Sequence, residues 1–244
     1  MEKLRIMNLE SLKIKFLKKI QFKYWSKNFA DRHEIRVPKN LKRKNHLSTR
    51  GGANINIILE LVNRTKLLEG DFAECGVYRG ATLIPLAIIS KERNRKVFAY
   101  DSFEGFDEDI EVDLKLGGAD NDEKRIQGFD NTSFEMVNNK VKLFDVSDNV
   151  IFRKGYFKNT LKEDESLDSR FSFVHLDCDI YESYKTCLEY FWPRMCKGGI
   201  ILFDEYLDPP WPGCKKAVDE FCNPKNIKIH EIIDNNYTKY YVQK

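Results

Sequence analysis

Short apolar runs alternate along the chain, from residue 53 onward, with segments in which apolar residues recur every three or four positions. The short runs are typical of strands that are buried on both faces, and the longer period is typical of helices. The runs predict strands at residues 71–75, 96–100, 150–157, 171–176 and 200–203. The period predicts helices at residues 57–68, 81–90, 133–139, 181–192 and 214–221. A β-hairpin is predicted to close the chain, with strands at 227–233 and 237–243.

This pattern divides the chain into two regions. Residues 51–244 are predicted to form an α/β domain, in which helices cover both faces of a mostly parallel sheet. Residues 1–50 are predicted to form a helical N-terminal arm with one apolar face. That face consists of Leu9, Leu12, Phe16, Ile20 and Tyr24.

One long polar stretch, residues 102–130, has no clear period and is rich in Asp, Glu and Gly. A connection of this length without structure of its own is unusual, which favours a lid that closes over a substrate. A flexible surface loop is the alternative. Trp211, which lies between two prolines, is expected either to form another wall of the substrate site or to pack against the sheet.

The net charge of +3 hides an uneven distribution, because residues 1–50 contain 15 basic and 4 acidic side chains and the remainder contains 26 and 34. The basic arm is predicted to pack on the domain or on a second copy of the chain. The alternative is contact with an anionic membrane surface through residues 1–45, or with an anionic acceptor. No nucleic-acid partner is predicted, because no nucleic-acid-binding motif accompanies the charge.

No apolar run is long enough to span a bilayer, and the first residues lack the continuous apolar stretch of a signal peptide. We therefore expect a cytoplasmic protein, located at the inner face of the membrane if the arm binds lipid. The six cysteines form no C-x-x-C pair and the four histidines show no metal-ligand spacing. Reduced, buried thiols are expected rather than a zinc site or a disulfide framework.

Candidate chemistry lies where the predicted strands end. The turn Glu74-Cys75-Gly76-Val77-Tyr78-Arg79-Gly80 allows a ligand to approach the backbone closely, although a glycine after a strand is common. Asp101 ends the next strand, where a carboxylate can accept hydrogen bonds from ribose hydroxyls or can simply cap a helix. Together they favour a nucleoside ligand. The turn lacks the G-x-G-x-x-G spacing of a dinucleotide site, which disfavours a nicotinamide dehydrogenase.

Two further strands end in Asp177-Cys178-Asp179 and Asp204-Glu205. Four carboxylates at neighbouring strand ends repel one another unless a cation or protons intervene. Oxygen ligands without histidine or thiolate favour Mg²⁺, Mn²⁺ or Ca²⁺ over zinc. A buried structural role for one or two of the carboxylates is the alternative, and Cys178 is expected to pack.

These residues belong to longer segments that together resemble the macrocin O-methyltransferase (TylF-type) family, a branch of the class I S-adenosylmethionine-dependent methyltransferases. The segments follow in the family's order from residue 50 to the end of the chain. They are DFAECGVYRGATL at 71–83, VFAYDSFEGF at 97–106, GFDNTSFEMV at 128–137, FRKGYFKNTL at 152–161, FVHLDCDIYESYKTCLEYFWPRMCKGGIILFDEY at 173–206 and PGCKKAVDEF at 212–221.

The resemblance implies a Rossmann-like, seven-stranded sheet in which the C-terminal hairpin supplies the reversed strand. It implies methyl transfer from S-adenosylmethionine to a hydroxyl of a sugar, on a glycosylated natural product or a surface glycan, assisted by Mg²⁺ (or Mn²⁺). Family members often form oligomers through N-terminal helices, so a homo-oligomer is expected.

The resemblance also implies roles for individual residues. Those assigned to the cofactor are Glu74, Gly76 and Tyr78 on the methionine side, Asp101, Ser102 and Phe103 at the ribose, Gly155 and Tyr156 near the adenine, and Asp177. Asp177, Asp204 and Glu205 would hold the metal, and Asp179 would be the general base. The family more often has two aspartates where this chain has Asp204-Glu205, but a glutamate can still coordinate a metal.

Two other functions are compatible with the same fold. The acceptor could be a catechol or another small vicinal diol instead of a sugar. The protein could also be a non-catalytic scaffold that docks through its basic arm, in which case changes at Asp177 or Asp179 would have little effect.

Overall fold

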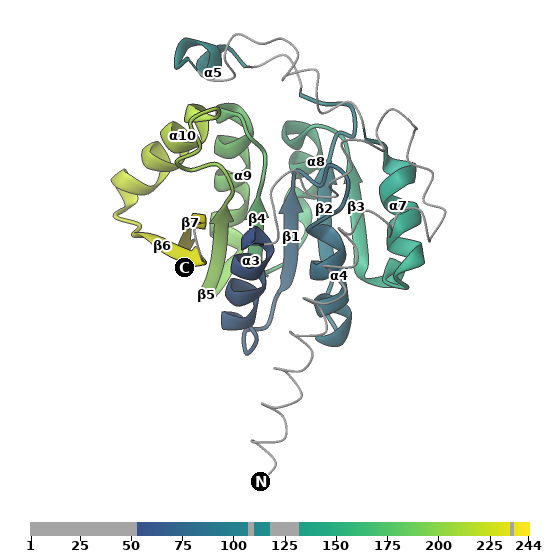
Figure 1. The fold of residues 1–244 in the computed structure, drawn as a ribbon. Coiled ribbons are helices and arrows are strands. Elements are labelled where there is room, and N and C mark those ends of the chain that lie inside the picture. The colour runs from purple at the N-terminus through teal and green to yellow at the C-terminus, as the bar shows by residue number, and fades with distance from the viewer. Residues whose placement is uncertain (1–52, 107–109, 118–131, 235–236) are drawn as a thin grey trace.

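The computed structural model describes residues 53–106, 110–117, 132–234 and 237–244, and the predicted arm at 1–50 lies outside the described residues. A seven-stranded sheet has the order β3-β2-β1-β4-β5-β7-β6 (Figure 1). Its pairs are parallel except those that β7 makes with β5 and β6. The strands are β1 (Asp71–Cys75), β2 (Val97–Asp101), β3 (Val150–Lys154), β4 (Phe171–Leu176), β5 (Met195–Phe203), β6 (Ile229–Asp234) and β7 (Tyr237–Gln243). The predicted seven-stranded, mostly parallel sheet with a reversed strand in the C-terminal hairpin is confirmed.

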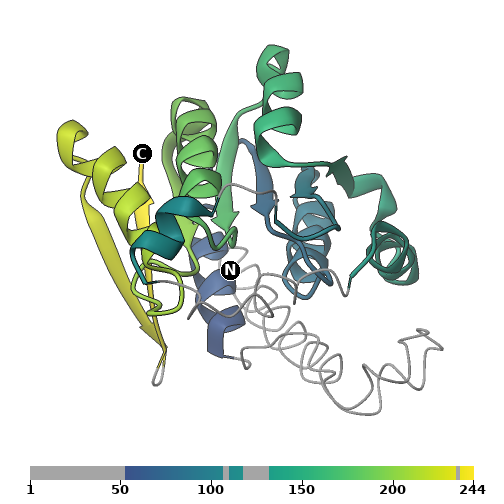
Figure 2. The same cartoon turned by 90° about the horizontal axis from the view of Figure 1, so that it is seen from above.

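Helices cover both faces of this sheet (Figure 2). One face carries α3 (Ala53–Arg64), α4 (Leu83–Glu92) and α7 (Phe134–Leu143). The other carries α8 (Phe157–Glu163), α9 (Tyr181–Arg194) and α10 (Pro212–Cys222). The short helix α5 (Glu111–Lys115) and three 3-10 turns, Ser147–Asn149, Asp164–Ser166 and Asn223–Lys225, complete the described elements.

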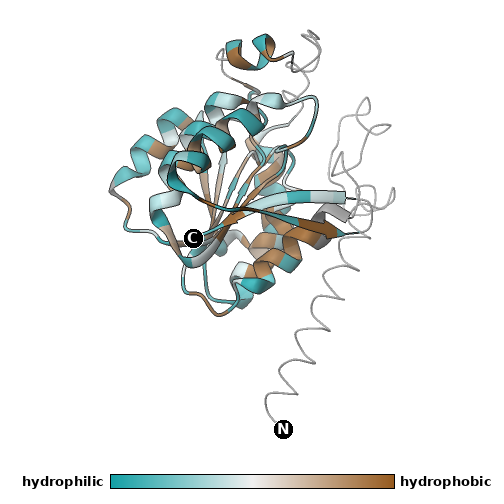
Figure 3. Cartoon of the chain, turned by 90° about the vertical axis from the view of Figure 1, so that its left-hand side faces the viewer, coloured by the Kyte–Doolittle hydropathy of each residue, from teal (hydrophilic) through white to brown (hydrophobic). Residues whose placement is uncertain are grey.

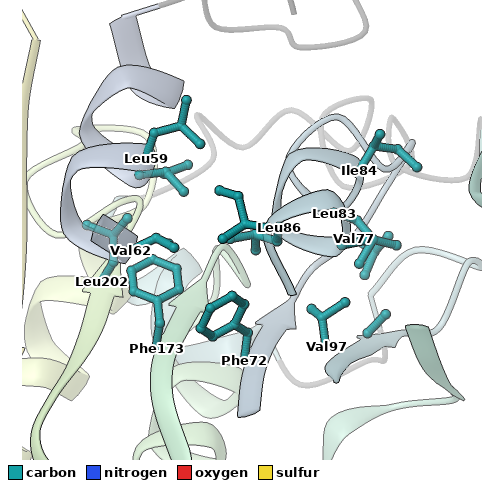
Figure 4. Packing of buried hydrophobic residues seen from close by; sticks show 14 of the residues in the cluster. Leu59, Val62, Phe72, Val77, Leu83, Ile84, Leu86, Val97, Phe173 and Leu202 are labelled. Atoms are coloured by element: carbon teal, nitrogen blue, oxygen red, sulfur yellow. The ribbon is translucent and has the colours of Figure 1, made fainter. Parts of the chain in front are cut away.

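The core consists of two apolar layers, one on each side of the sheet. All six residues of β4 are buried, as expected for a central parallel strand. On one side, Phe72 and Phe173 pack edge to face with ring centroids 6.3 Å apart, beneath Val62 of α3 and Leu86 of α4 (Figure 4). Apolar residues accordingly concentrate on the strands and on the inward sides of the helices, whereas the outward sides are polar (Figure 3). Among the described residues, no helix combines the length and the apolar character needed to cross a membrane.

Several predicted element boundaries differ from the structure, and the largest difference is at β5, which begins at Met195 and not at residue 200. The strand predicted at 150–157 ends at Lys154, because Gly155 has a φ of +143° that ends the extended conformation, and Phe157 begins α8. The helix predicted at 57–68 ends at Arg64, and Leu67 is 88% exposed. The stretch 102–130, expected to lack regular structure, contains α5.

The strand order reverses between β1 and β4, since β2 and β3 lie on one side of β1 while β4 and β5 lie on the other. Ligands of open α/β sheets bind at such a point, beyond the carboxyl ends of the strands. Glu74, Asp101, Asp177 and Asp204 all lie at or just past those ends, which brings the predicted site residues to one edge of the sheet.

Candidate active site

The turn after β1 needs glycine at position 76. Gly76 has a φ of +89°, and a Cβ placed on it would lie 1.7 Å from the carbonyl oxygen of Asp177. The ends of β1 and β4 are joined there by a hydrogen bond from the Asp177 N–H to the Cys75 carbonyl (2.9 Å). Gly76 therefore keeps the two strand ends in contact at the point where the sheet order reverses.

Asp101 is held by backbone donors from two loops. Its Oδ2 accepts from the Tyr78 N–H at 2.7 Å, and its Oδ1 accepts from the Phe103 N–H at 2.6 Å. Both donor residues have a positive φ, 48° for Tyr78 and 58° for Phe103, a conformation that costs about 1–3 kcal/mol and is found preferentially at functional sites. Burial raises the pKa of Asp101, and the backbone N–H donors partly offset that effect.

The other residues predicted around the ribose and adenine lie close to Asp101. The Gly155 N–H donates to the Asp101 carbonyl (2.9 Å), which brings the end of β3 beside the end of β2. The Ser102 hydroxyl donates to the Gly105 carbonyl (2.6 Å) and accepts from the Glu104 N–H (3.1 Å), so it closes its own turn. Tyr156 stands at the N-cap of α8.

Glu74 and His175 form a buried pair across β1 and β4. They are register partners, each about 1% exposed, and Glu74 Oε1 lies 3.3 Å from His175 Nδ1. The other carboxylate oxygen of Glu74, Oε2, is buried without a hydrogen-bond partner. Burial raises the pKa of Glu74 to about 7, against the opposing effect of His175. A buried acceptor without a donor points to a ligand group that would donate to it.

Asp204 lies between the side chains of Lys239 and His175. The ammonium of Lys239, on β7, donates to Asp204 Oδ1 (2.6 Å) and to its backbone carbonyl (2.7 Å). His175 Nε2 lies 3.7 Å from the same Oδ1, which is an ion-pair distance and longer than a hydrogen bond. Burial alone would lower the pKa of His175, but Asp204 and Glu74 raise it to about 10. Its Nε2 is buried without a hydrogen-bond partner.

Glu205 follows Asp204 in the bend after β5 but has different partners. It is fully buried, and the Tyr184 hydroxyl donates to its Oε2 (2.5 Å), while Oε1 has no hydrogen-bond partner. Burial, and then the negative charges of Asp177 and Asp204, raise the pKa of Glu205 well above its ordinary value. The pKa of Asp177 is raised by burial and by Asp204.

Two groups of potential metal ligands result, each with its ligand atoms within 4.8 Å of one another among the residues that the structure describes. One consists of Asp177, Asp179 and Glu205, and the other of His175, Asp177 and Asp204. The predicted set Asp177, Asp204 and Glu205 is thus split between the two groups, with Asp177 in both. In the second group, the Lys239 ammonium already occupies the Oδ1 atom of Asp204.

The first group suits a hard divalent cation. It provides three carboxylates, and one buried oxygen of Glu205 has no hydrogen-bond partner. The pKa values of Glu205 and Asp177 are raised, and a bound cation would lower them because it stabilises the ionised carboxylates. Asp179, predicted as the general base, is in this group, and its φ of 58° turns the chain sharply between β4 and α9.

Part of the predicted lid is anchored beside this group. Asp113 of α5 is buried, and its Oδ2 accepts from the Tyr181 N–H at the start of α9 (3.0 Å). A Cβ on Gly213, at the start of α10, would lie 1.8 Å from Asp113 Oδ1, so glycine is needed there for α5 to lie across the ends of both helices (Figure 2). Trp211 packs against Phe106 (centroids 5.7 Å apart), in a cluster that includes Ile180 and Ile110.

Three site residues were missed by sequence reasoning, namely His175, Lys239 and Tyr184. His175 lies two residues before Asp177, so alternation along β4 was a signal that could have found it. Lys239 and Tyr184 are separated from their partners by 35 and 21 positions, and only the fold brings them together. The six cysteines are unpaired thiols, and all except Cys196 are buried.

The sheet order, the reversed strand β7, the glycine turn after β1 and the acidic residue at the end of β2 define a class I methyltransferase fold. The solved O-methyltransferase NovP has this fold, with a TM-score of 0.70 and 28% identity over 82% of this chain and 83% of that one. The calicheamicin methyltransferase CalS11 shares it at a TM-score of 0.66 and 18% identity, over 94% of this chain and 91% of that one. The family model for the macrocin O-methyltransferases (TylF) matches residues 46–244, and the chain belongs to that family.

Two curated relatives are enzymes that methylate natural products. Demethyldecarbamoylnovobiocin O-methyltransferase of Streptomyces niveus is 32% identical over 158 residues, which cover 63% of this chain and 58% of the relative. Mycinamicin III 3''-O-methyltransferase of Micromonospora griseorubida is 30% identical over 172 residues, which cover 68% and 65%. The chain spans less than two thirds of the length of each of these relatives.

Proposed function

We propose that the protein is an S-adenosylmethionine- and divalent-metal-dependent O-methyltransferase, and that its acceptor is a hydroxyl of a sugar on a glycosylated natural product or a surface glycan. The observation that carries the proposal is the position of two features at one edge of the sheet: the clamped carboxylate of Asp101 and the carboxylate group of Asp177, Asp179 and Glu205. The family and the names of the relatives favour the reaction and the acceptor class.

The cofactor would lie across the ends of β1 and β2. Asp101 would accept hydrogen bonds from the ribose hydroxyls, with Tyr78, Ser102 and Phe103 beside it, and Gly155 and Tyr156 would border the adenine. The orphaned Oε2 of Glu74 would accept a hydrogen bond from the ammonium of the methionine part, with Gly76 nearby. Asp177 would border the cofactor and the metal.

In the reaction, a hydroxyl oxygen attacks the sulfonium methyl, the methyl–sulfur bond breaks, and S-adenosylhomocysteine leaves. The hydroxyl proton would pass to the carboxylate of Asp179. Asp177 and Glu205 would hold Mg²⁺ or Mn²⁺ together with Asp204, and the ion would polarise two neighbouring hydroxyls of the acceptor. The protein's main task is alignment, because a sulfonium methyl is already activated.

Calorimetric titration with S-adenosylmethionine and S-adenosylhomocysteine, with and without Mg²⁺, tests the proposal on the wild type and on Asp101→Ala. We expect binding to the wild type and its loss in the variant. An acceptor screen then compares glycosides with catechols in the presence of Mg²⁺, and turnover of catechols alone would reassign the acceptor. Absence of cofactor binding under every condition would favour a non-catalytic scaffold.

A further inference from the structure

Four charged or polar side chains form one buried row across the sheet: Glu74 on β1, His175 on β4, Asp204 after β5 and Lys239 on β7. The strand register explains the row. Glu74 pairs with His175, His175 with Leu202, and Phe203 with Tyr240, so that Asp204 comes opposite Lys239 one step further along. The row links two proposed sites, since Glu74 lies at the proposed cofactor site and Asp204 at the proposed metal site.

His175 lies at the middle of this row, and each of its ring nitrogens faces a different carboxylate. Nδ1 lies 3.3 Å from Glu74 Oε1, and Nε2 lies 3.7 Å from Asp204 Oδ1. The ring is almost completely buried, with about 1% exposed. An imidazole ring is rigid, so the ring orientation that places Nδ1 beside Glu74 also fixes the position of Nε2 beside Asp204.

We propose that His175 is a positioning residue for both sites: its Nδ1 edge orients Glu74 for the cofactor, and its Nε2 edge orients Asp204 for the metal. This inference rests on the proposed function. Polar groups behind a ligating side chain commonly set its orientation, and their loss lowers metal affinity about 10–100-fold. Glu74 depends on His175 in the same way, because its Oε1 would otherwise be a second unpaired oxygen beside Oε2.

Two substitutions separate the edges of the ring. The side-chain amide of asparagine reaches the position of Nδ1, and that of glutamine reaches the position of Nε2. We therefore expect His175→Asn to keep S-adenosylhomocysteine affinity and to lower Mn²⁺ affinity about tenfold or more. We expect His175→Gln to show the reverse. Calorimetry measures the first affinity, and the electron paramagnetic resonance signal of free Mn²⁺ measures the second, so neither readout depends on activity.

Lys239→Met is the matched control. Lys239 also holds Asp204 but is separated from Glu74 by β5 and β4, so this variant should bind S-adenosylhomocysteine like the wild type. Circular dichroism first establishes that both His175 variants are folded, so that a general loss of structure is not counted as a result. An equal response of the two variants, when the wild type binds both ligands, would overturn the inference and leave the proposed function intact. A wild type that binds no S-adenosylhomocysteine would overturn the proposed function and the inference together.

The ¹⁵N resonances of the His175 ring in the wild type give a second test, which stays decisive if the variants do not fold. We expect S-adenosylhomocysteine to shift mainly Nδ1 and Mg²⁺ to shift mainly Nε2. A ring whose two nitrogens respond to neither ligand, or to one ligand only, would refute a role that serves both sites.

Discussion

Replacement of Gly76 by alanine should disable the site by separating two strand ends. The added Cβ would lie 1.7 Å from the Asp177 carbonyl oxygen, about half of an ordinary contact distance, so the ends of β1 and β4 must move apart. That movement would strain or break the hydrogen bond from the Asp177 N–H to the Cys75 carbonyl. Loss of a buried hydrogen bond costs about 1–3 kcal/mol, and alanine at positive φ adds about 1–2 kcal/mol.

Gly105 provides a matched control, because it has the same φ of +89° but no atom within 4 Å of an added Cβ. Gly105→Ala should therefore carry only the backbone cost of about 1–2 kcal/mol. Gly76→Ala should lose about 2–5 kcal/mol of unfolding free energy in urea denaturation, together with S-adenosylhomocysteine binding in calorimetry. Equal destabilisation of the two variants would refute the clash, and retained binding in Gly76→Ala would refute the placement of the cofactor.

Four further predictions concern other parts of the molecule. Burial lowers the pKa of Lys140 to about 7, below its unfolded value of 10.5, so its ammonium loses its proton in the native state first and its contribution to the unfolding free energy should rise from pH 7 to pH 10. Because His175 titrates in the opposite sense, the measurement is the difference between the wild type and Lys140→Met in urea denaturation, which should shift in favour of the wild type across this range. Asp113→Ala should lower the unfolding free energy by about 1–2 kcal/mol, because it removes the hydrogen bond to the start of α9, and it should speed hydrogen exchange in α5. Glu111→Gln, an exposed change on the same helix, is the control and should have neither effect. Chelation by EDTA should abolish methyl transfer and Mg²⁺ should restore it, and activity that persists without a divalent ion would contradict metal dependence. Deletion of residues 1–40 should reduce sedimentation with anionic liposomes or the oligomeric state in light scattering, and an unchanged result in both assays would contradict both interpretations of the arm.

Much of the sheet was predictable because central parallel strands are continuously apolar. β1 and β4 match their predicted bounds, and the C-terminal hairpin matches within two residues at its start. The boundary at Gly155 failed for a local reason, since apolar residues continue into α8 and only the backbone conformation of the glycine separates strand from helix. Helix α5 was missed because tertiary contacts of Asp113 hold it, and its five residues are too few for a detectable period.

The sequence predicted that the acidic residues of the site lie at strand ends, but it did not predict which of them would form a common group of potential metal ligands. Sequence adjacency placed Asp204 and Glu205 together, whereas the structure gives them different partners. The partners that distinguish them, Lys239 for one and Tyr184 for the other, depend on the antiparallel register of β7 and on the packing of α9. Neither is encoded in local spacing.

This division accounts for how the chain accommodates a glutamate at position 205. An aspartate there would draw the carboxylate back by about 1.5 Å, one carbon–carbon bond, away from the Tyr184 hydroxyl that now donates to it at 2.5 Å. The longer side chain reaches Tyr184 and still keeps a buried oxygen without a hydrogen-bond partner in the group with Asp177 and Asp179. Asp204 is held by Lys239 and needs no such reach. The two acidic neighbours are therefore held by different partners: Lys239 holds Asp204 in the charged row, and Tyr184 holds Glu205 beside Asp177 and Asp179.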